Sequence, residues 1–223
     1  MFSISEAWRE SYPGAAVGVL AMRDVSNPVS HAAMDRVKEE LEEQIRARFA
    51  SKDETRAQDR LQAYRAYYKR FKKTYHVQLQ LESIAFKNKS IPSVAALVEA
   101  MFAAELKNML LTAGHDLDIV EPPVTLDVAQ GHERYVRING QEQQLKAGDM
   151  FIADSQGVLS SVIYGPDRRT RILPETRSVL FTVYAPPGIA EEAVRQHLRD
   201  MEGYVRLIAP QAETELLQVS EAT

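Results

Sequence analysis

Helical periodicity dominates the first half of the chain. Between residues 31 and 50, apolar side chains recur at every third or fourth position, which predicts an amphipathic helix with Ser30 as its N-cap. A second helix is predicted from Asp53, and residues 94–110 predict a third, with Ser93 as its cap. The apolar stripe of the second helix consists of Leu61, Tyr64, Tyr68 and Phe71, with Tyr67 off the stripe.

Two further segments of this half have a different pattern. Residues 15–22 are small and β-branched after a Pro-Gly pair, which predicts a buried strand. Residues 76–86 fit the alternation of a strand and the spacing of a helix equally well, so both structures stay open there.

After Gly114 the pattern changes to short β-type runs with turns between them. A last helix is predicted over residues 190–208, and the tail from Gln211 is expected to be frayed. The Asn139-Gly140 pair predicts a hairpin. The predicted strands cover residues 124–129, 134–138, 149–154, 158–164 and 178–184.

This order of elements predicts an α+β fold, with helices packed on mixed or antiparallel sheets. The N-terminal half is rich in helices and the C-terminal half in strands. We expect one domain over residues 1–223, made of two interlocked subregions at roughly 1–113 and 114–223.

The composition narrows the class of protein. The chain has 223 residues, 45% of them hydrophobic, and a formal net charge of −4, so any contact with nucleic acid has to be local. It has no cysteine, which excludes disulfides, thiolate zinc sites and cysteine nucleophiles. The beginning of the chain lacks the pattern of a signal peptide, and no apolar run approaches the roughly 20 residues of a membrane span. We therefore expect a soluble, cytoplasmic protein without a membrane partner.

Several catalytic signatures are absent from the sequence. It contains no GxGxxG, no GxxxxGK[ST], no HExxH and no GxSxG motif. His115 lies beside Asp116 and Asp118, and this cluster suggests either a metal ligand set or a turn in which aspartates cap backbone amides. Calcium and zinc both require more ligands than the cluster offers, so the turn is favoured and no metal or cofactor is expected.

Two clusters of cations are candidate contacts for RNA. Residues 64–73 interleave five cations with four aromatic rings, and residues 165–171 form a cationic loop between two predicted strands. Cations bind phosphates and rings stack on bases, but a solvated basic face over packed rings would have the same pattern. The nucleic-acid candidates are Arg65, Lys69, Arg70, Lys73, Arg168 and Arg169.

The ordered series of segments over residues 12–185 resembles the B3/B4 domain of the phenylalanyl-tRNA synthetase β subunit, and more closely the free-standing B3/B4 proteins. The stretches that carry the resemblance are YPGAAVGVLAM, YRAYYKRF, NKSIPSVAALVEAMFAAEL, AGHDLD and the strand-rich segment from VTLDVA to FTVY. In the synthetase, this domain hydrolyses tyrosine that is wrongly attached to the phenylalanine tRNA. The resemblance implies an α+β fold with a pocket between helix and sheet, and a connection with tRNA or aminoacyl-tRNA.

The resemblance also indicates which residues would line the pocket. The synthetase domain has a Thr-Asn pair on the helix that matches VEAMFAAEL, and this chain has Met101 and Phe102 there. The synthetase's pocket histidine matches Ala113, with His115 two residues later. Apolar side chains therefore stand at positions where the synthetase has polar ones.

The remaining pocket positions also differ from those of the synthetase domain. The carboxylate that recognises the tyrosine hydroxyl matches Thr182, and a pair of small residues matches roughly Ser161 and Val162. A site that selects a phenol needs a buried polar partner, because an unpaired polar group costs about 1–3 kcal/mol. The resemblance thus implies a preserved scaffold without the tyrosine-specific groups.

Three hypotheses of function follow. The first is an RNA-binding protein that associates with aminoacyl-tRNA, with hydrolysis of misacylated tRNA as its reaction and no ligase activity of its own. The second is a non-catalytic binder of an apolar amino acid or other small ligand, and the third is an interaction module. Ester hydrolysis needs little beyond a positioned water and backbone donors, so the first hypothesis requires no particular catalytic side chain.

Overall fold

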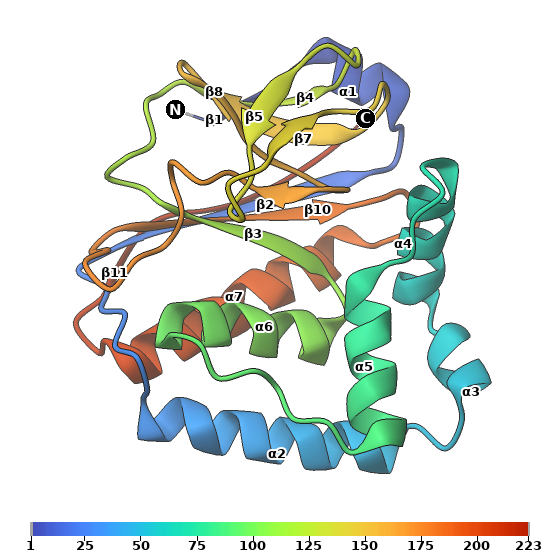
Figure 1. Ribbon diagram of the computed structural model, residues 1–223, viewed down its shortest axis with the longest axis vertical. Helices are drawn as coiled ribbons and strands as arrows, with labels where there is room; N and C mark the ends of the chain where they lie inside the picture. Colours follow the sequence, from blue (N-terminus) through green and yellow to red (C-terminus); the bar gives the residue numbers. More distant parts are fainter. Residues whose placement is uncertain (1, 223) are drawn as a thin grey trace.

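The computed structural model describes residues 2–222 and shows three layers (Figure 1). A five-stranded sheet lies above a four-stranded sheet, and helices cover the lower face of the four-stranded sheet. The helices are α1 (Glu6–Ser11), α2 (Ala32–Arg48), α3 (Lys52–Arg56), α4 (Asp59–Arg70), α5 (His76–Lys87), α6 (Ala96–Asn108) and α7 (Glu191–Ile208). The strands are β1 (Phe2–Ile4), β2 (Ala16–Arg23), β3 (Leu111–Asp116), β4 (Val124–Val128), β5 (Arg134–Val136), β6 (Glu142–Gln144), β7 (Met150–Asp154), β8 (Gly157–Ser161), β9 (Gly165–Pro166), β10 (Val179–Ala185) and β11 (Glu213–Glu221).

The four-stranded sheet has the order β11-β2-β10-β3, and all of its strand pairs are antiparallel. Its strands β2 and β10 are almost entirely buried, because the second sheet covers one face and the helices the other. At Gly18 of β2, a Cβ would approach Cγ1 of Val194 to 2.6 Å, so glycine permits the close packing of α7. Strand β3 lies at the edge of this sheet.

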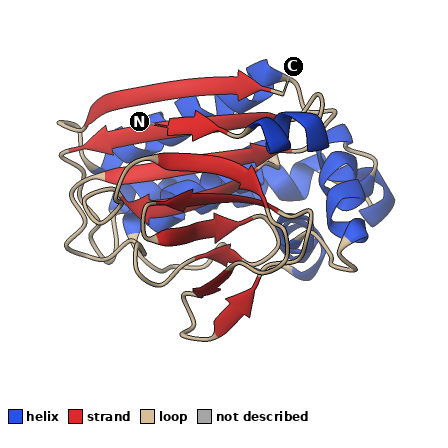
Figure 2. Ribbon diagram, turned by 90° about the horizontal axis from the view of Figure 1, so that it is seen from above, coloured by secondary structure: helices blue, strands red, loops and turns tan. Residues whose placement is uncertain are grey.

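The five-stranded sheet has the order β1-β4-β7-β8-β9 and is mixed, because β1 pairs with β4 in parallel. Strands β5 and β6 form a separate hairpin around Asn139-Gly140, as predicted, and Gly140 has a φ of 82° in the turn. Figure 2 shows the strands from above, with the helices beneath them. The observed architecture confirms the predicted α+β class.

The helical layer is built on α6 and α7, which pack against each other under the four-stranded sheet, with α2 below them (Figure 1). The segment with the ambiguous pattern, residues 76–86, is helical and forms α5. Val77, Leu81 and Ile84 are buried at helical spacing. The contacts that α5 makes with α2 and α6 therefore select the helix.

Three predictions about the ends of helices are wrong. Residue 31, not Ser30, is the N-cap of α2, and Ser93 lies two residues before the N-cap of α6. The Ser93 hydroxyl instead accepts a hydrogen bond from Lys38 Nζ at 3.0 Å, a contact between distant segments. The helix predicted from Asp53 is divided into α3 and α4, with Ser51 capping α3 through the Glu54 N–H.

The expectation of a frayed tail is also wrong. Residues 213–221 form β11, which pairs with β2 along the whole length of that strand. The segment has little apolar character of its own, but the neighbouring strand provides a ladder of backbone hydrogen bonds. Strand β3 was likewise not predicted, because its six residues follow a helix directly.

Among residues 2–222, no helix combines the length and the apolar composition needed to cross a membrane.

Candidate functional site

A cavity of about 500 Å³ lies between α6 and the edge strand β3. Residues three and four positions apart on a helix share a face, and one face of α6 forms a wall of the cavity. The opposite side is formed by the segment from Ser161, the last residue of β8, to Pro166 of β9, and by Arg137 and Ile138 of the β5–β6 hairpin. The wall on α6 consists of Val98, Met101, Phe102 and Glu105.

The structure brings five of the seven predicted pocket residues to this cavity. They come from α6, from β3, which follows α6 directly in the chain, and from the end of β8, which is distant from both in the sequence. Most of the wall area they form is carbon, so the cavity suits an apolar group. These five residues are Met101, Phe102, Ala113, Ser161 and Val162.

His115 does not line the cavity; its side chain is fully buried between the two sheets. Its Nδ1 lies 2.8 Å from the Thr170 hydroxyl, and its Nε2 lies 3.1 Å from the Ser160 hydroxyl. Burial lowers the pKa of His115 to about 3, so the ring is neutral at neutral pH. Because Thr170 donates to the Asp167 carboxylate, it accepts from Nδ1–H, which assigns the neutral tautomer.

The hydrogen-bonded chain through His115 reaches the cavity wall at Tyr184. The Ser160 hydroxyl lies 2.7 Å from the hydroxyl of Tyr184, and the Tyr184 side chain lines the cavity. With Nε2 as an acceptor, Ser160 donates to the histidine and accepts from Tyr184. The network therefore positions Tyr184 and joins the two sheets.

Thr182 is also outside the cavity lining, although it is the direct neighbour of Ala113 in the ladder between β10 and β3. Its side chain is fully buried. The hydroxyl oxygen has no hydrogen-bond partner among the described residues. Neither Thr182 nor His115 can therefore touch a ligand in the cavity as the structure stands.

Glu105 lines the cavity and was missed in the sequence. Its side chain is 2% exposed, and its Oε1 accepts a hydrogen bond from the Thr112 N–H at 2.7 Å. Burial raises the pKa of Glu105 to about 8, with the Thr112 N–H acting in the opposite direction. A signal was present in the sequence: Glu105 follows Met101 by four residues and Phe102 by three, which puts a carboxyl group on their face of the helix.

The backbone of Gly114 gives the cavity a hydrogen-bond donor. The N–H groups of Thr112 and Asp116 point away from β10, to Glu105 Oε1 and to the carbonyl of Thr170, at 2.7 Å in both cases. In an antiparallel pair every second residue directs its N–H to the same side. The Gly114 N–H therefore also points away from β10, and Gly114 lines the cavity.

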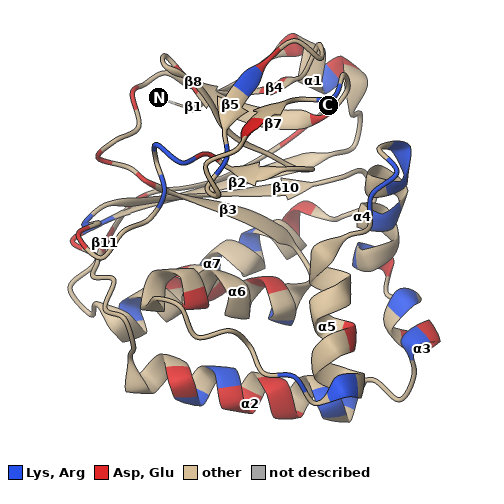
Figure 3. Cartoon of the chain, in the orientation of Figure 1, with Lys and Arg blue, Asp and Glu red and all other residues tan. Residues whose placement is uncertain are grey.

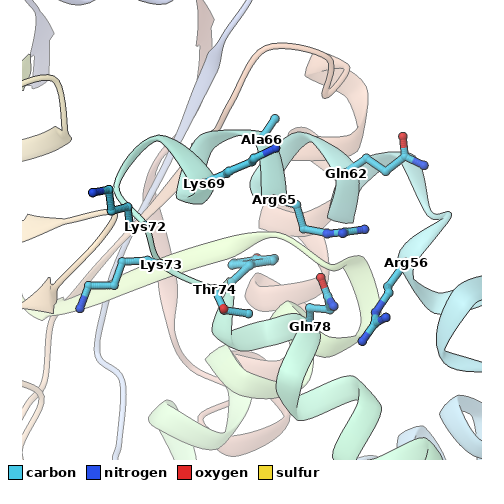
Figure 4. A pocket seen from close by; sticks show the side chains of 10 residues that line it. Arg56, Gln62, Arg65, Ala66, Lys69, Lys72, Lys73, Thr74 and Gln78 are labelled. Atoms are coloured by element: carbon cyan, nitrogen blue, oxygen red, sulfur yellow. The ribbon is translucent and has the colours of Figure 1, made fainter.

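A second hollow, which we term the basic groove, lies between α4 and α5 and has a volume of about 890 Å³. Figure 4 shows its cationic side chains around the groove, and Figure 3 shows the concentration of Lys and Arg along α4. Four of the cations make no ion pair with any residue from 2 to 222. The basic groove is lined by Arg56, Arg65, Lys69, Lys72 and Lys73 together with Gln62, Ala66, Thr74, Tyr75 and Gln78, and the four unpaired cations are Arg65, Lys69, Lys72 and Lys73.

The rings of α4 are not available to bases, because they are packed in the core. Tyr64, Tyr67 and Tyr68 are each at most 3% exposed. The Tyr64 hydroxyl accepts from the Leu111 N–H and donates to the carbonyl of Tyr184, so it completes the ladder between β3 and β10. The basic cluster on α4 is thus a charged outer face over a packed aromatic interior.

The other three predicted cations lie outside the basic groove. The guanidinium of Arg70 lies over the rings of Tyr12 and Tyr67, at 5.2 and 5.9 Å from their centroids. Arg169 forms an ion pair with Asp154 at 2.8 Å. Arg168 is exposed on the loop after β9.

The basic groove and the cavity meet around the start of α5. Lys73 belongs to the groove and Tyr164 to the cavity wall, and Lys73 Nζ lies 5.6 Å from the centroid of the Tyr164 ring. Tyr75 of the groove is followed directly by His76 of the cavity. The two hollows are therefore adjacent at the junction between α4 and α5.

The cluster around His115 forms the predicted turn. Asp116 Oδ1 accepts a hydrogen bond from the Asp118 N–H at 3.1 Å. Within residues 2–222, no group of three or more His, Asp or Glu side chains is arranged to hold a metal ion.

Comparison with known proteins agrees with this architecture. A search of curated proteins finds no match. An N-terminal fragment of the phenylalanyl-tRNA synthetase β-subunit from Pyrococcus horikoshii has a similar fold, with a TM-score of 0.51 at 12% identity. The alignment covers 99% of this chain and 54% of that fragment, so this chain spans about half of its length.

A family model described as the B3/4 domain matches residues 60–205. The matched range includes nearly all of α4 and continues through α5, α6, β3 and β10, which are the segments that build both the cavity and the basic groove. It covers well over half of the chain. The chain therefore belongs to the B3/4 domain family.

Proposed function

We propose that this protein binds the aminoacylated end of a tRNA, with phosphates in the basic groove and the aminoacyl group in the cavity. The observation that carries the proposal is the contact between the two hollows, where Lys73 of the groove lies over Tyr164 of the cavity wall. Unpaired cations in a groove bind phosphates, and an apolar cavity takes a side chain. Each hollow matches one part of the same ligand.

The proposed reaction is hydrolysis of the aminoacyl ester. Water attacks the carbonyl carbon, the bond from that carbon to the ribose oxygen breaks, and the ribose hydroxyl leaves with a proton. Negative charge develops on the carbonyl oxygen, where a positioned backbone N–H is an effective donor. The Gly114 N–H, which faces the cavity from the edge of β3, is the candidate for this role.

The walls favour an apolar amino acid as the group that is removed. Val98, Met101 and Phe102 form an apolar wall that offers no hydrogen bond to a phenol, His115 and Thr182 do not line the cavity, and the carboxyl group beside this wall, Glu105, suits an ammonium group. An enzyme that selects tyrosine by its hydroxyl needs a partner for that group. We therefore expect aliphatic substrates to be preferred over tyrosine.

The test is deacylation of a panel of tRNAs charged with tyrosine or with aliphatic amino acids. The variants are Ala113→Leu and Val98→Phe, which fill the cavity from β3 and from α6 respectively. Both variants should lose deacylation at least tenfold while they still shift tRNA in a gel, because the basic groove is untouched. Deacylation that is unaffected by both variants would exclude the cavity as the site of reaction.

A second function, binding of a small apolar ligand without chemistry, is supported by the apolar wall of α6. Under this alternative every tRNA of the panel stays charged. Apolar ligands would then bind with the same affinity whether or not tRNA is present.

A further inference from the structure

We infer that Glu105 binds the ammonium group of the ligand in the cavity between α6 and β3. This inference rests on the proposed function, because an aminoacyl ester carries an α-ammonium group and no free carboxylate. It adds a specificity determinant that the pattern of the family did not provide.

The first argument is the arrangement of the carboxyl group. Oε1 of Glu105 is held by the Thr112 N–H at 2.7 Å, while Oε2 has no hydrogen-bond partner among residues 2–222. No Lys, Arg or His of the described chain lies within 4.0 Å of either oxygen. A carboxyl group that lines a cavity with one oxygen fixed and the other unused is positioned to receive a donor from a ligand.

The second argument is the surroundings of this carboxyl group. Buried carboxylates are normally paired, because an isolated charge in an apolar environment is costly. Tyr64 and Tyr68 of α4 and Tyr75 before α5 face Glu105, and burial raises the pKa of all three phenols well above neutrality, so they stay uncharged. The described residues therefore supply no cation for Glu105, which stays mostly protonated at neutral pH, and a ligand with an ammonium group would supply the missing counter-charge.

The third argument is the remaining chemistry of the cavity. Val98, Met101 and Phe102 adjoin Glu105 on the same helix face, so the ligand that fits combines an ammonium group with an apolar tail. Two basic side chains line the cavity: His76, and Arg137, whose Nε donates to the carbonyl of Tyr164 at 3.1 Å. Partial desolvation lowers the pKa of His76, and burial raises that of Glu105 to about 8, so Glu105 is the group that changes its charge between pH 7 and pH 9.

The probe is 3-methylbutylamine, whose ammonium group, like that of lysine, stays protonated to about pH 10. Its neutral isostere 3-methylbutan-1-ol is the matched ligand control. Binding of the amine requires Glu105 to lose its proton, so the affinity of the wild-type protein should rise about tenfold from pH 7 to pH 9. The affinity for the alcohol should not rise, and both are measured by NMR titration.

The variant is Glu105→Gln, which keeps an acceptor for the Thr112 N–H and removes the charge. It should weaken amine binding at pH 9 by about tenfold or more and abolish the pH dependence. The control is Glu43→Gln, an exposed glutamate of α2, which should behave like the wild-type protein.

Three results would overturn the inference: no amine binding by the wild-type protein, equal amine binding by Glu105→Gln, or an affinity that falls as the pH rises. The last would mean that ionisation of Glu105 opposes binding of the amine. The tRNA gel shift is recorded with the same samples. An intact shift with failed amine binding rejects the role of Glu105 alone, whereas loss of the shift rejects the proposed function itself.

Discussion

The hydroxyl of Thr182 shows how a single buried group departs from the rule that buried polar atoms are paired. The residue lies in the middle of β10, fully buried, and its Oγ1 has no partner among residues 2–222. A buried polar atom without a hydrogen bond costs roughly 1–3 kcal/mol. A β-branched residue of the same shape would suit the strand equally well.

We therefore predict that Thr182→Val raises the free energy of unfolding by about 1 kcal/mol, because it removes the unpaired hydroxyl and keeps the shape. Thr182→Ala should lower it by about 1–2 kcal/mol, because it leaves a void. Urea denaturation of the two variants measures both changes. A Thr182→Val protein that is less stable than the wild type would mean that the hydroxyl has a partner in solution.

Glu105 is a buried group that can ionise, and its raised pKa predicts how the free energy of unfolding depends on pH. Its pKa of about 8 in the folded protein is above the ordinary value of 4.5, so the folded state holds the proton more tightly than the unfolded chain. The resulting contribution of Glu105 to the free energy of unfolding is fully present below pH 4.5 and is lost as the pH rises to about 8.

Glu105→Gln, which cannot ionise, should therefore be more stable than the wild type at pH 9, by roughly 4 kcal/mol, and closer to it at pH 5. Urea unfolding at the two pH values measures the difference. An equal difference at both pH values would show that Glu105 is already ionised in the folded protein.

At the scale of elements, the strand β11 illustrates a structure that depends on its partner. Its burial alternates only weakly, and Leu216, Leu217 and Val219 are partly buried against the core. The backbone ladder with β2 accounts for its order. The same ladder protects β2, a buried apolar strand that would otherwise lie at the edge of the sheet.

Removal of residues 212–223 should therefore expose the edge of β2 and make the protein aggregate or unfold at a clearly lower urea concentration. Solubility after expression and the urea midpoint are the measurements. A truncated protein with an unchanged midpoint would show that β11 adds nothing to the stability of the sheet.

At the scale of the whole molecule, the sign of the net charge differs from the sign of the charge in the basic groove. The chain has a net charge of −4, yet Arg65, Lys69, Lys72 and Lys73 gather in the basic groove without acidic partners. Binding of phosphates at four cations releases counterions, so the affinity for tRNA should fall with salt. The slope of log affinity against log salt should be about −3.

The variant Lys69→Glu with Lys73→Glu should weaken tRNA binding more than tenfold at low salt and reduce that slope by about half. The control is Arg36→Glu with Lys87→Glu, two exposed cations of α2 and α5 outside the groove, which changes the net charge by the same amount. Gel shifts over a salt series measure both. Equal effects of the two double variants would mean that net charge, and not the groove, governs binding.

The sequence by itself determined the elements whose signal is local. The helical spacing of α2, α6 and α7 and the β-type runs of β2 and β10 are each contained within a single segment, as is the hairpin turn at Asn139-Gly140. The ordered series of these segments also carried the resemblance to the B3/B4 domain. Periodicity and turn residues act over a few positions, so a linear pattern suffices to predict them.

Tertiary structure alone decided what depends on distant residues. It made β11 a strand, made residues 76–87 a helix, and buried His115 and Thr182 away from the cavity that Met101, Phe102 and Ala113 line. It also left Glu105, which helical spacing puts on the same face as Met101 and Phe102, without an ion-pair partner among residues 2–222. Burial, strand pairing and the absence of a counter-charge are properties of neighbours in space, and no linear pattern specifies them.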